Sequence, residues 1–101
     1  MSYIYSIIRK DIPLADQIVQ TAHSAFHAGE NYGEGDIPSL ILLEIANQEE
    51  LLALAKKLDA KCIEYFKFFE PDDNFGYTSL TTEPIDDELR KAFSNLRLWR
   101  A

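Results

Sequence analysis

Two stretches of apolar residues, each followed by a helical pattern, constrain the fold of this chain most strongly. Residues 3–8 are β-branched or aromatic almost throughout, which is typical of a strand buried on both faces. Residues 39–45 form a second stretch of this kind. Because a strand–helix–strand unit connects parallel strands through a right-handed crossover, we expect the first two strands to pair in parallel.

The helices are indicated by caps and by periodic apolar side chains. The first helix is expected to begin with Asp11 as its N-cap and Pro13 in its first turn, and to run to about Ala28 before Gly29 ends it. Its expected core-facing stripe recurs every three or four residues and consists of Leu14, Ile18, Ala22, Ala25 and Phe26. A capping box, Asn47 followed by Glu50, predicts the start of a second helix.

The second half of the chain predicts two more strands and a last helix. Residues 61–69, which include Cys62 as an inert packing residue, are expected to form the third strand, and residues 77–82 the fourth. The Pro-Asp-Asp-Asn turn at residues 71–74 predicts an antiparallel hairpin between them. A helix should follow Pro84. Residues 1–101 therefore predict a single α/β domain of order β-α-β-α-β-β-α, with a four-stranded mixed sheet and helices on both faces.

Composition restricts the possible partners and the location. Acidic residues outnumber basic ones by 17 to 10, a net charge of −7, which disfavours DNA and general nucleic-acid binding. No apolar run is long enough to span a membrane, and the N-terminus lacks the features of a signal peptide. A lone cysteine fits a reducing compartment, so we expect a cytoplasmic protein. Because so short a chain buries a thin core, we also expect a homodimer.

A polar stripe on the first helix supplies candidate catalytic residues. Asp16, Gln20, His23 and His27 recur along one helical face, and His23 is suited to general acid–base chemistry near neutral pH. The alternative is that this stripe is only the solvated side of the helix. His23 and His27 have the spacing of metal ligands, but two histidines without a third ligand do not predict a metal site. No cofactor motif is present.

Three further polar residues lie at strand ends. Arg9 and Asp11 follow the first strand, where open α/β sheets bind ligands, so Arg9 could hold a phosphate and Asp11 a polar group. Equally, Asp11 could cap the helix and Arg9 could pair with it. Glu70 ends the third strand, where a partly desolvated carboxylate could act as a base or orient His23.

These residues together resemble the type-2 peptidyl-tRNA hydrolases. The resemblance rests on Arg9-Lys10-Asp11 after the first strand and on a helix bearing Gln20-x-x-His23, and the order of the elements is similar over nearly the whole chain. It implies the fold of that family, hydrolysis of the ester between peptide and tRNA, and a cytoplasmic enzyme without a cofactor. The site residues that it implies are Arg9, Asp11, Gln20, His23, Thr78, and either Glu70 or Asp72 as the acid.

The chain also departs from the pattern of that family. Asp16 stands where the family has a lysine implicated in catalysis and in gripping tRNA, and the helix entry is about two residues shorter. The Arg and Thr of the second family motif are not reproduced. Two hypotheses therefore follow: a peptidyl-tRNA-hydrolase-like enzyme, or a non-catalytic dimeric binding or regulatory homologue that retains the fold but lacks the lysine.

Overall fold

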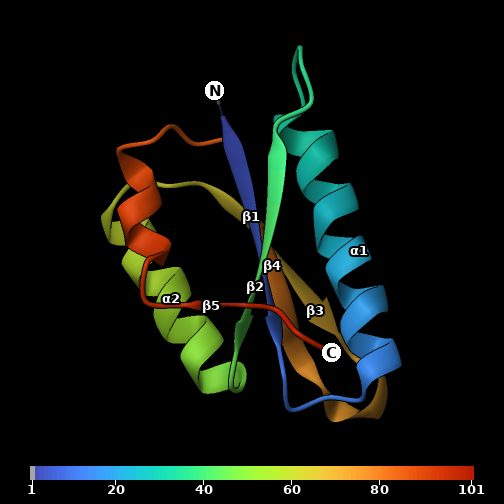
Figure 1. Cartoon of the computed structure of the whole chain (residues 1–101). Helices are drawn as coiled ribbons and strands as arrows, with labels where there is room; N and C mark the ends of the chain where they lie inside the picture. Colours follow the sequence, from blue (N-terminus) through green and yellow to red (C-terminus); the bar gives the residue numbers. More distant parts are fainter. Residues whose placement is uncertain (1) are drawn as a thin grey trace.

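A five-stranded mixed sheet forms the centre of the computed structural model, which describes residues 2–101 (Figure 1). Its strands are β1 (Tyr3–Arg9), β2 (Ser39–Ile45), β3 (Tyr65–Glu70), β4 (Gly76–Thr82) and β5 (Arg97–Leu98). The α-helices are α1 (Leu14–Tyr32) and α2 (Gln48–Ala60), and the two 3-10 helices are η1 (Asp72–Asn74) and η2 (Leu89–Phe93).

The sheet has the strand order β3-β4-β1-β2-β5. The predicted parallel pairing of β1 with β2 and the predicted antiparallel hairpin of β3 with β4 are both confirmed. The expected number of four strands is wrong, because the C-terminal segment adds β5, which pairs antiparallel to β2 at Leu43 and Glu44. A two-residue strand carries no alternation of its own, so the sequence gives no signal for it.

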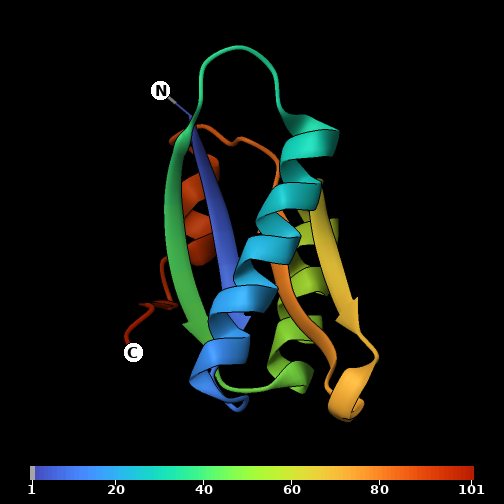
Figure 2. The ribbon, with the colours of Figure 1, turned by 90° about the vertical axis from the view of Figure 1, so that its right-hand side faces the viewer.

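Helices cover both faces of the sheet, as predicted. Helix α1 lies on one face, and α2 and η2 lie on the other (Figures 1 and 2). The main hydrophobic core lies between the sheet and the α2 layer; its buried members include Ile7, Leu43, Leu51, Leu58, Leu80 and Phe93. No helix within residues 2–101 is long and apolar enough to cross a membrane.

Helix α2 begins as the sequence predicts. The backbone N–H of Glu50 donates to Asn47 Oδ1 over 2.9 Å, and the Glu50 carboxylate accepts from the backbone N–H of Ala46 over 3.1 Å. This is the reciprocal arrangement of a capping box, shifted by one residue at its second bond. The bounds of β2 are also those expected from the sequence.

Several predicted boundaries are wrong. Asp11 does not cap α1: the N-cap position belongs to Pro13, and no side-chain hydrogen bond caps the helix. The helix continues past Gly29 to Tyr32, and Gly33 follows it, where any Cβ atom would clash with the Gly29 carbonyl oxygen. Gly29 is therefore an internal helical residue, and Gly33 is the residue at which the helix has to end.

The third strand and the last helix also differ from expectation. Strand β3 begins at Tyr65, because Cys62 belongs to the turn after α2, has a φ of 58° and is exposed. The backbone N–H of Cys62 donates to the Asp59 carbonyl oxygen, so it cannot join a ladder there. The helix expected after Pro84 is only the 3-10 helix η2.

The orientation of α1 contradicts the sequence prediction most clearly. The stripe expected to face the core is largely exposed, with Leu14, Ile18 and Phe26 at 48%, 58% and 70% of their full exposure. The helix instead buries Gln17, Gln20, Ser24 and Ala28. The reason lies in the sheet, whose face beneath α1 presents hydroxyl groups.

A chain of three buried hydroxyls joins α1 to the sheet. Thr81 Oγ1 on β4 lies 2.8 Å from Ser24 Oγ on α1 and 2.7 Å from Ser6 Oγ on β1. Ser24 Oγ also donates to the backbone oxygen of Thr21 over 3.3 Å. Buried hydroxyls need partners of this kind, and an apolar helix face against this part of the sheet would leave them without any.

Candidate functional site

A β-bulge in the β3–β4 hairpin directs two adjacent side chains toward α1. Phe68 pairs with Ser79 but Phe69 pairs with Tyr77, so Thr78 is an extra residue on β4. Thr78 Oγ1 donates to Gln20 Oε1 over 3.3 Å, and Ser79 Oγ donates to the Gln20 backbone oxygen over 2.8 Å. Gln20 is thus fixed from two sides in the helix–sheet interface.

Gln20 in turn holds Glu70 at the end of β3. Its Nε2 donates to Glu70 Oε2 over 3.1 Å, and the backbone N–H of Asp72 donates to Glu70 Oε1 over 3.0 Å. The hydrogen bond from Asp72, followed by that from Gln20, lowers the pKa of Glu70 below its ordinary value of 4.5, and the nearby His23 contributes further. The effect of these groups outweighs desolvation, so Glu70 is ionised at neutral pH.

His23 lies on the exposed side of α1, close enough to Glu70 for its charge to lower the pKa of that carboxylate. Its ring meets the edge of Phe68 on β3, with 4.7 Å between centroids. One turn further on, His27 stacks on Phe66 at 4.7 Å and lies 3.6 Å from the Glu30 carboxylate. Across residues 2–101, no three His, Cys, Asp or Glu side chains gather as metal ligands would.

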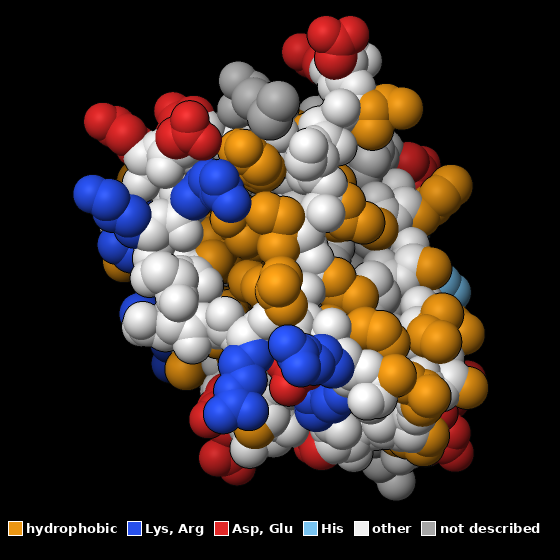
Figure 3. All heavy atoms as spheres, in the orientation of Figure 1, with side chains coloured by type: hydrophobic (Ala, Val, Ile, Leu, Met, Phe, Trp, Pro, Cys, Tyr) orange, Lys and Arg blue, Asp and Glu red, His pale blue; other side chains and the backbone are white. Residues whose placement is uncertain are grey.

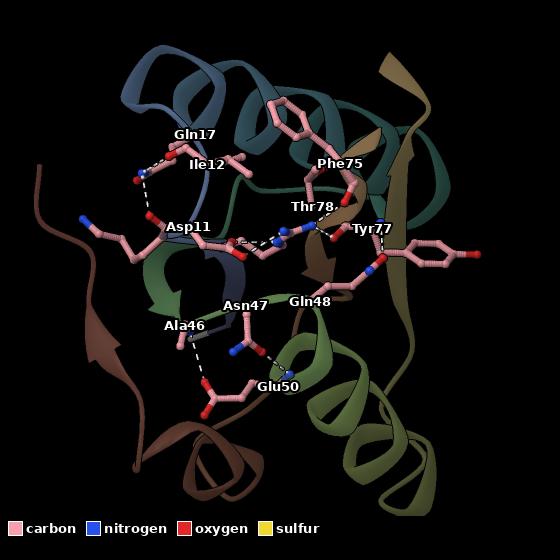
Figure 4. A network of polar contacts seen from close by, with 12 residues as sticks. Asp11, Ile12, Gln17, Ala46, Asn47, Gln48, Glu50, Phe75, Tyr77 and Thr78 are labelled. Atoms are coloured by element: carbon pink, nitrogen blue, oxygen red, sulfur yellow. Dashed lines mark hydrogen bonds and ion pairs between the residues drawn. The ribbon is translucent and has the colours of Figure 1, made fainter. Parts of the chain in front are cut away.

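Arg9 and Asp11 form a separate cluster with the start of β4. Arg9 Nε and Nη2 donate to the two Asp11 carboxylate oxygens over 2.8 and 2.9 Å. Nη1 donates to the carbonyl oxygens of Phe75 and, over 3.1 Å, Tyr77. Figure 4 shows Asp11, Phe75 and Tyr77 converging at this end of the sheet. Of the alternatives left open by the sequence, the pairing of Arg9 with Asp11 is the one present.

This cluster uses most of the hydrogen-bonding capacity of Arg9. A guanidinium carries five N–H donors, and here four hydrogen bonds go to protein oxygens. The side chain is only 11% exposed. Arg9 therefore clamps the β3–β4 connection to the end of β1, next to the bulge that orients Gln20.

The structure brings together four of the seven predicted site residues: Gln20, His23, Glu70 and Thr78. Arg9 and Asp11 pair with each other, and Asp72 approaches the site through its backbone N–H while its side chain is exposed. Of the four, Gln20 and Thr78 are buried, at 3% and 0% exposure. A ligand at this surface would meet His23 and Glu70.

Sequence reasoning missed Ser79, which supports the site, and the hydrogen-bond partner of Trp99. Ser79 holds the Gln20 backbone, and the run of hydroxyl residues on this strand was its only signal. Trp99, from the C-terminal tail, donates through Nε1 to Gln17 Oε1 over 2.8 Å and so ties the tail to the first turn of α1. The apolar residues 96–99 predict that the tail packs back on the domain, but no local signal identifies the partner of Trp99, 82 residues away.

An apolar cavity of about 340 Å³ lies at the other end of α1. It is bordered by the last turns of the helix, the following loop and the start of β1, and its lining includes Ile4, Ala28, Tyr32, Ile37 and Pro84. None of the seven predicted site residues lines it. The cavity and the cluster around Glu70 are therefore two separate sites beside α1.

The fold is similar to that of a protein of unknown function from Agrobacterium tumefaciens strain C58. The two structures superpose with a TM-score of 0.78 over 98% of each chain, at 14% sequence identity. A likeness at this identity shows a shared fold alone. A scan against models of protein families finds no match, and a search of curated proteins finds none either.

Proposed function

We propose that this chain has a peptidyl-tRNA-hydrolase-like fold and hydrolyses an ester between an acyl or peptidyl group and a nucleotide-bearing alcohol. The observation that carries the proposal is the ionised Glu70 carboxylate beside the accessible imidazole of His23. A carboxylate near a histidine stabilises the imidazolium that forms when the histidine accepts a proton. The resemblance to type-2 peptidyl-tRNA hydrolases supplies the substrate class, with peptidyl-tRNA as the partner.

In the proposed reaction, His23 accepts a proton from a water molecule as the water oxygen attacks the ester carbonyl carbon. The bond from that carbon to the alcohol oxygen then breaks, and the imidazolium returns the proton to the leaving oxygen. The products are a carboxylic acid and an alcohol, with one C–O bond formed and one broken. Positioned proton transfer of this kind contributes about 10²–10⁴-fold to a rate.

The buried members of the cluster act by positioning. Gln20 holds Glu70 while Thr78 and Ser79 hold Gln20, so the bulge fixes the carboxylate relative to the helix that carries His23. Asp72 contributes its backbone N–H to Glu70, and its carboxylate is not needed for this role. Arg9 and Asp11 maintain the strand end from which the bulge begins.

The test measures release of peptide from peptidyl-tRNA by purified protein under single-turnover conditions. We expect His23→Ala to lower the rate by about 100-fold or more, since it removes the base, and Glu70→Gln to lower it less. His27→Ala is the matched control, since His27 occupies the next turn of the same helix without a contact to Glu70, and its rate should stay near that of the wild type. Wild-type protein that releases no peptide above background, or an unchanged rate in His23→Ala, refutes the proposal.

A second candidate is the non-catalytic dimeric binding or regulatory homologue. It is favoured by the engagement of Arg9 with protein oxygens, which leaves only one of its five N–H donors for a phosphate. Asp16 in place of the family lysine and the net charge of −7 point the same way. This candidate predicts no hydrolysis and no salt-sensitive retention on immobilised tRNA, whereas the enzyme should be retained at low salt and released as salt rises.

A further inference from the structure

The outward face of α1 is mostly apolar, and the exposed carboxylate of Glu30 borders it in the last turns. The positions opposite its buried stripe are Ala15, Ile18, Val19, Ala22, Phe26 and Gly29. Val19 is 48% exposed, and Ile18 and Phe26 are more exposed still. A helix on a sheet surface usually turns such a face inward, so its exposure here calls for a partner.

The apolar surface continues from α1 onto the sheet. Leu40 on β2 pairs with Ile4, and Ile4 lines the cavity beneath Ala28 of α1, so Leu40 lies on the α1 side of the sheet. Leu40 is 54% exposed, and Ile37, in the loop before β2, is 96% exposed. Figure 3 shows apolar side chains gathered along the side of the molecule where α1 lies. We call this surface the α1 apolar face; its members are Leu14, Ile18, Val19, Phe26, Ile37 and Leu40.

The size of this face is that of an interface core. With about 150–250 Å² for a fully exposed aromatic side chain and less for aliphatic ones, its six side chains expose on the order of 600 Å². This reaches the upper end of the largest apolar patches on monomeric proteins, about 300–600 Å². A standard interface buries about 800 Å² on each partner, which this face and a narrow polar rim would supply.

We propose that the α1 apolar face binds a second copy of this chain, with the two α1 helices packed antiparallel about a two-fold axis near Ala22. Small residues at a spacing of seven, Ala15, Ala22 and Gly29, let two helix backbones approach closely along this line. The spacing of seven, with Ile18 and Val19 following the first small residue, is that of a helix–helix seam.

The two-fold axis gives a specific set of contacts. In an antiparallel pair centred on Ala22, Ile18 of one copy meets Phe26 of the other. Ala15 meets Gly29 in the same way. Large side chains thus face each other across an isologous interface, in which every contact occurs twice.

Charge favours a second copy at this face rather than elsewhere. Each copy carries a net charge of −7, so two copies repel one another over most of their surfaces. The positions Ala15, Ile18, Val19, Ala22, Phe26 and Gly29 hold no carboxylate, although Glu30 borders them, and they form an uncharged strip through which two acidic molecules can associate. Salt screens the remaining repulsion, so the dimer should become tighter as the NaCl concentration rises.

The first test uses sedimentation velocity over a range of protein concentrations. Wild-type protein should dimerise, and Ile18→Lys or Phe26→Glu should each weaken the dimer by about 100-fold or more, since each places a charge in the seam. Leu98→Glu is the matched control: Leu98 is 64% exposed but pairs with core residue Leu43, which places it on the other side of the sheet, so the dimer should persist.

Mixing the two charged variants tests the antiparallel register itself. An Ile18→Lys chain and a Phe26→Glu chain should form a heterodimer. In it the introduced lysine of one chain meets the introduced glutamate of the other, and the second contact is the native one between Phe26 and Ile18. Circular dichroism confirms that each variant is folded. A monomeric wild type, a dimer that survives both substitutions, or a mixture that stays monomeric overturns the proposal.

Cross-linking tests the position of the axis. In a Cys62→Ser background, Ala22→Cys should form an intermolecular disulfide rapidly on mild oxidation, because the two copies of residue 22 meet at the axis. Ala53→Cys, at an exposed position on α2, should not. Equal cross-linking of the two variants contradicts the proposed interface. These outcomes are independent of peptidyl-tRNA hydrolysis, since His23 lies on the flank of the helix toward β3.

Discussion

Replacing Thr81 with Val should destabilise the protein more than replacing Thr81 and Ser6 together. Thr81 is fully buried, and its hydroxyl links Ser6 Oγ on β1 with Ser24 Oγ on α1 over 2.7 and 2.8 Å. Ser24 also has a bond to the Thr21 backbone oxygen, but Thr81 is the partner of the Ser6 hydroxyl. Valine has nearly the shape of threonine, so Thr81→Val removes these hydrogen bonds with little change in packing.

The magnitude follows from the two lost bonds and from the hydroxyl left behind. Each hydrogen bond contributes about 0.5–1.5 kcal/mol, and a buried group left without a partner costs about 1–3 kcal/mol. We therefore expect Thr81→Val to lower the free energy of unfolding by about 2–6 kcal/mol. In Ser6→Ala/Thr81→Val the Ser6 hydroxyl, which Thr81→Val leaves without a partner, is also removed. The free energy of unfolding of the double variant should therefore be higher than that of Thr81→Val by on the order of 1 kcal/mol.

Urea denaturation measures these differences at constant m value. Thr81→Ser is the control, since it keeps the hydroxyl and loses a methyl group worth about 0.8 kcal/mol. A double variant less stable than Thr81→Val would refute the reasoning, because it would mean that the Ser6 hydroxyl keeps a hydrogen-bond partner in the single variant. A Thr81→Val variant as stable as wild type would show that the hydroxyl chain contributes nothing.

Three further outcomes are expected from charged and ionisable groups. Because the pKa of Glu70 is lowered in the folded protein, its contribution to stability is present above pH 4.5 and is lost as the pH falls below that value. When the free energy of unfolding is measured at decreasing pH, Glu70→Gln should lose less stability than the wild type. Burial and the hydrogen bond to Asp59 raise the pKa of Tyr65 to about 12, so the free energy of unfolding should fall between pH 10 and 12. Tyr65→Phe should make that fall smaller, as measured by urea denaturation at each pH. Asp11→Asn should lower the free energy of unfolding by about 1–3 kcal/mol, because Arg9 keeps a largely buried charge without its counter-ion; an unchanged midpoint in urea would contradict this.

The candidate site was only partly predictable. Gln20 and His23 are marked by their spacing on one helix, and Glu70 by its place at a strand end. Their assembly depends on the bulge at Thr78, which turns Thr78 and Ser79 toward the same helix. A bulge is set by the pairing of β4 with β3, and strict alternation along β4 gives no sign of it. The partners of Arg9 on β4 were also not predictable. Arg9 donates to the backbone oxygens of Phe75 and Tyr77, and every residue type carries such an oxygen.

The sequence by itself determined the order of the elements from β1 to β4, the parallel pairing of β1 with β2, the hairpin and the cap of α2. These features depend on local signals: apolar runs, turn residues and a side chain three positions from its backbone partner. Only the tertiary structure decided which face of α1 lies inward. Both an apolar and a polar stripe recur at helical spacing, and the choice depended on the hydroxyls of Ser6, Ser79 and Thr81 on the opposing sheet. Because those groups lose water on burial, the stripe of Gln17, Gln20, Ser24 and Ala28 covers them, and the apolar stripe of α1 remains outside.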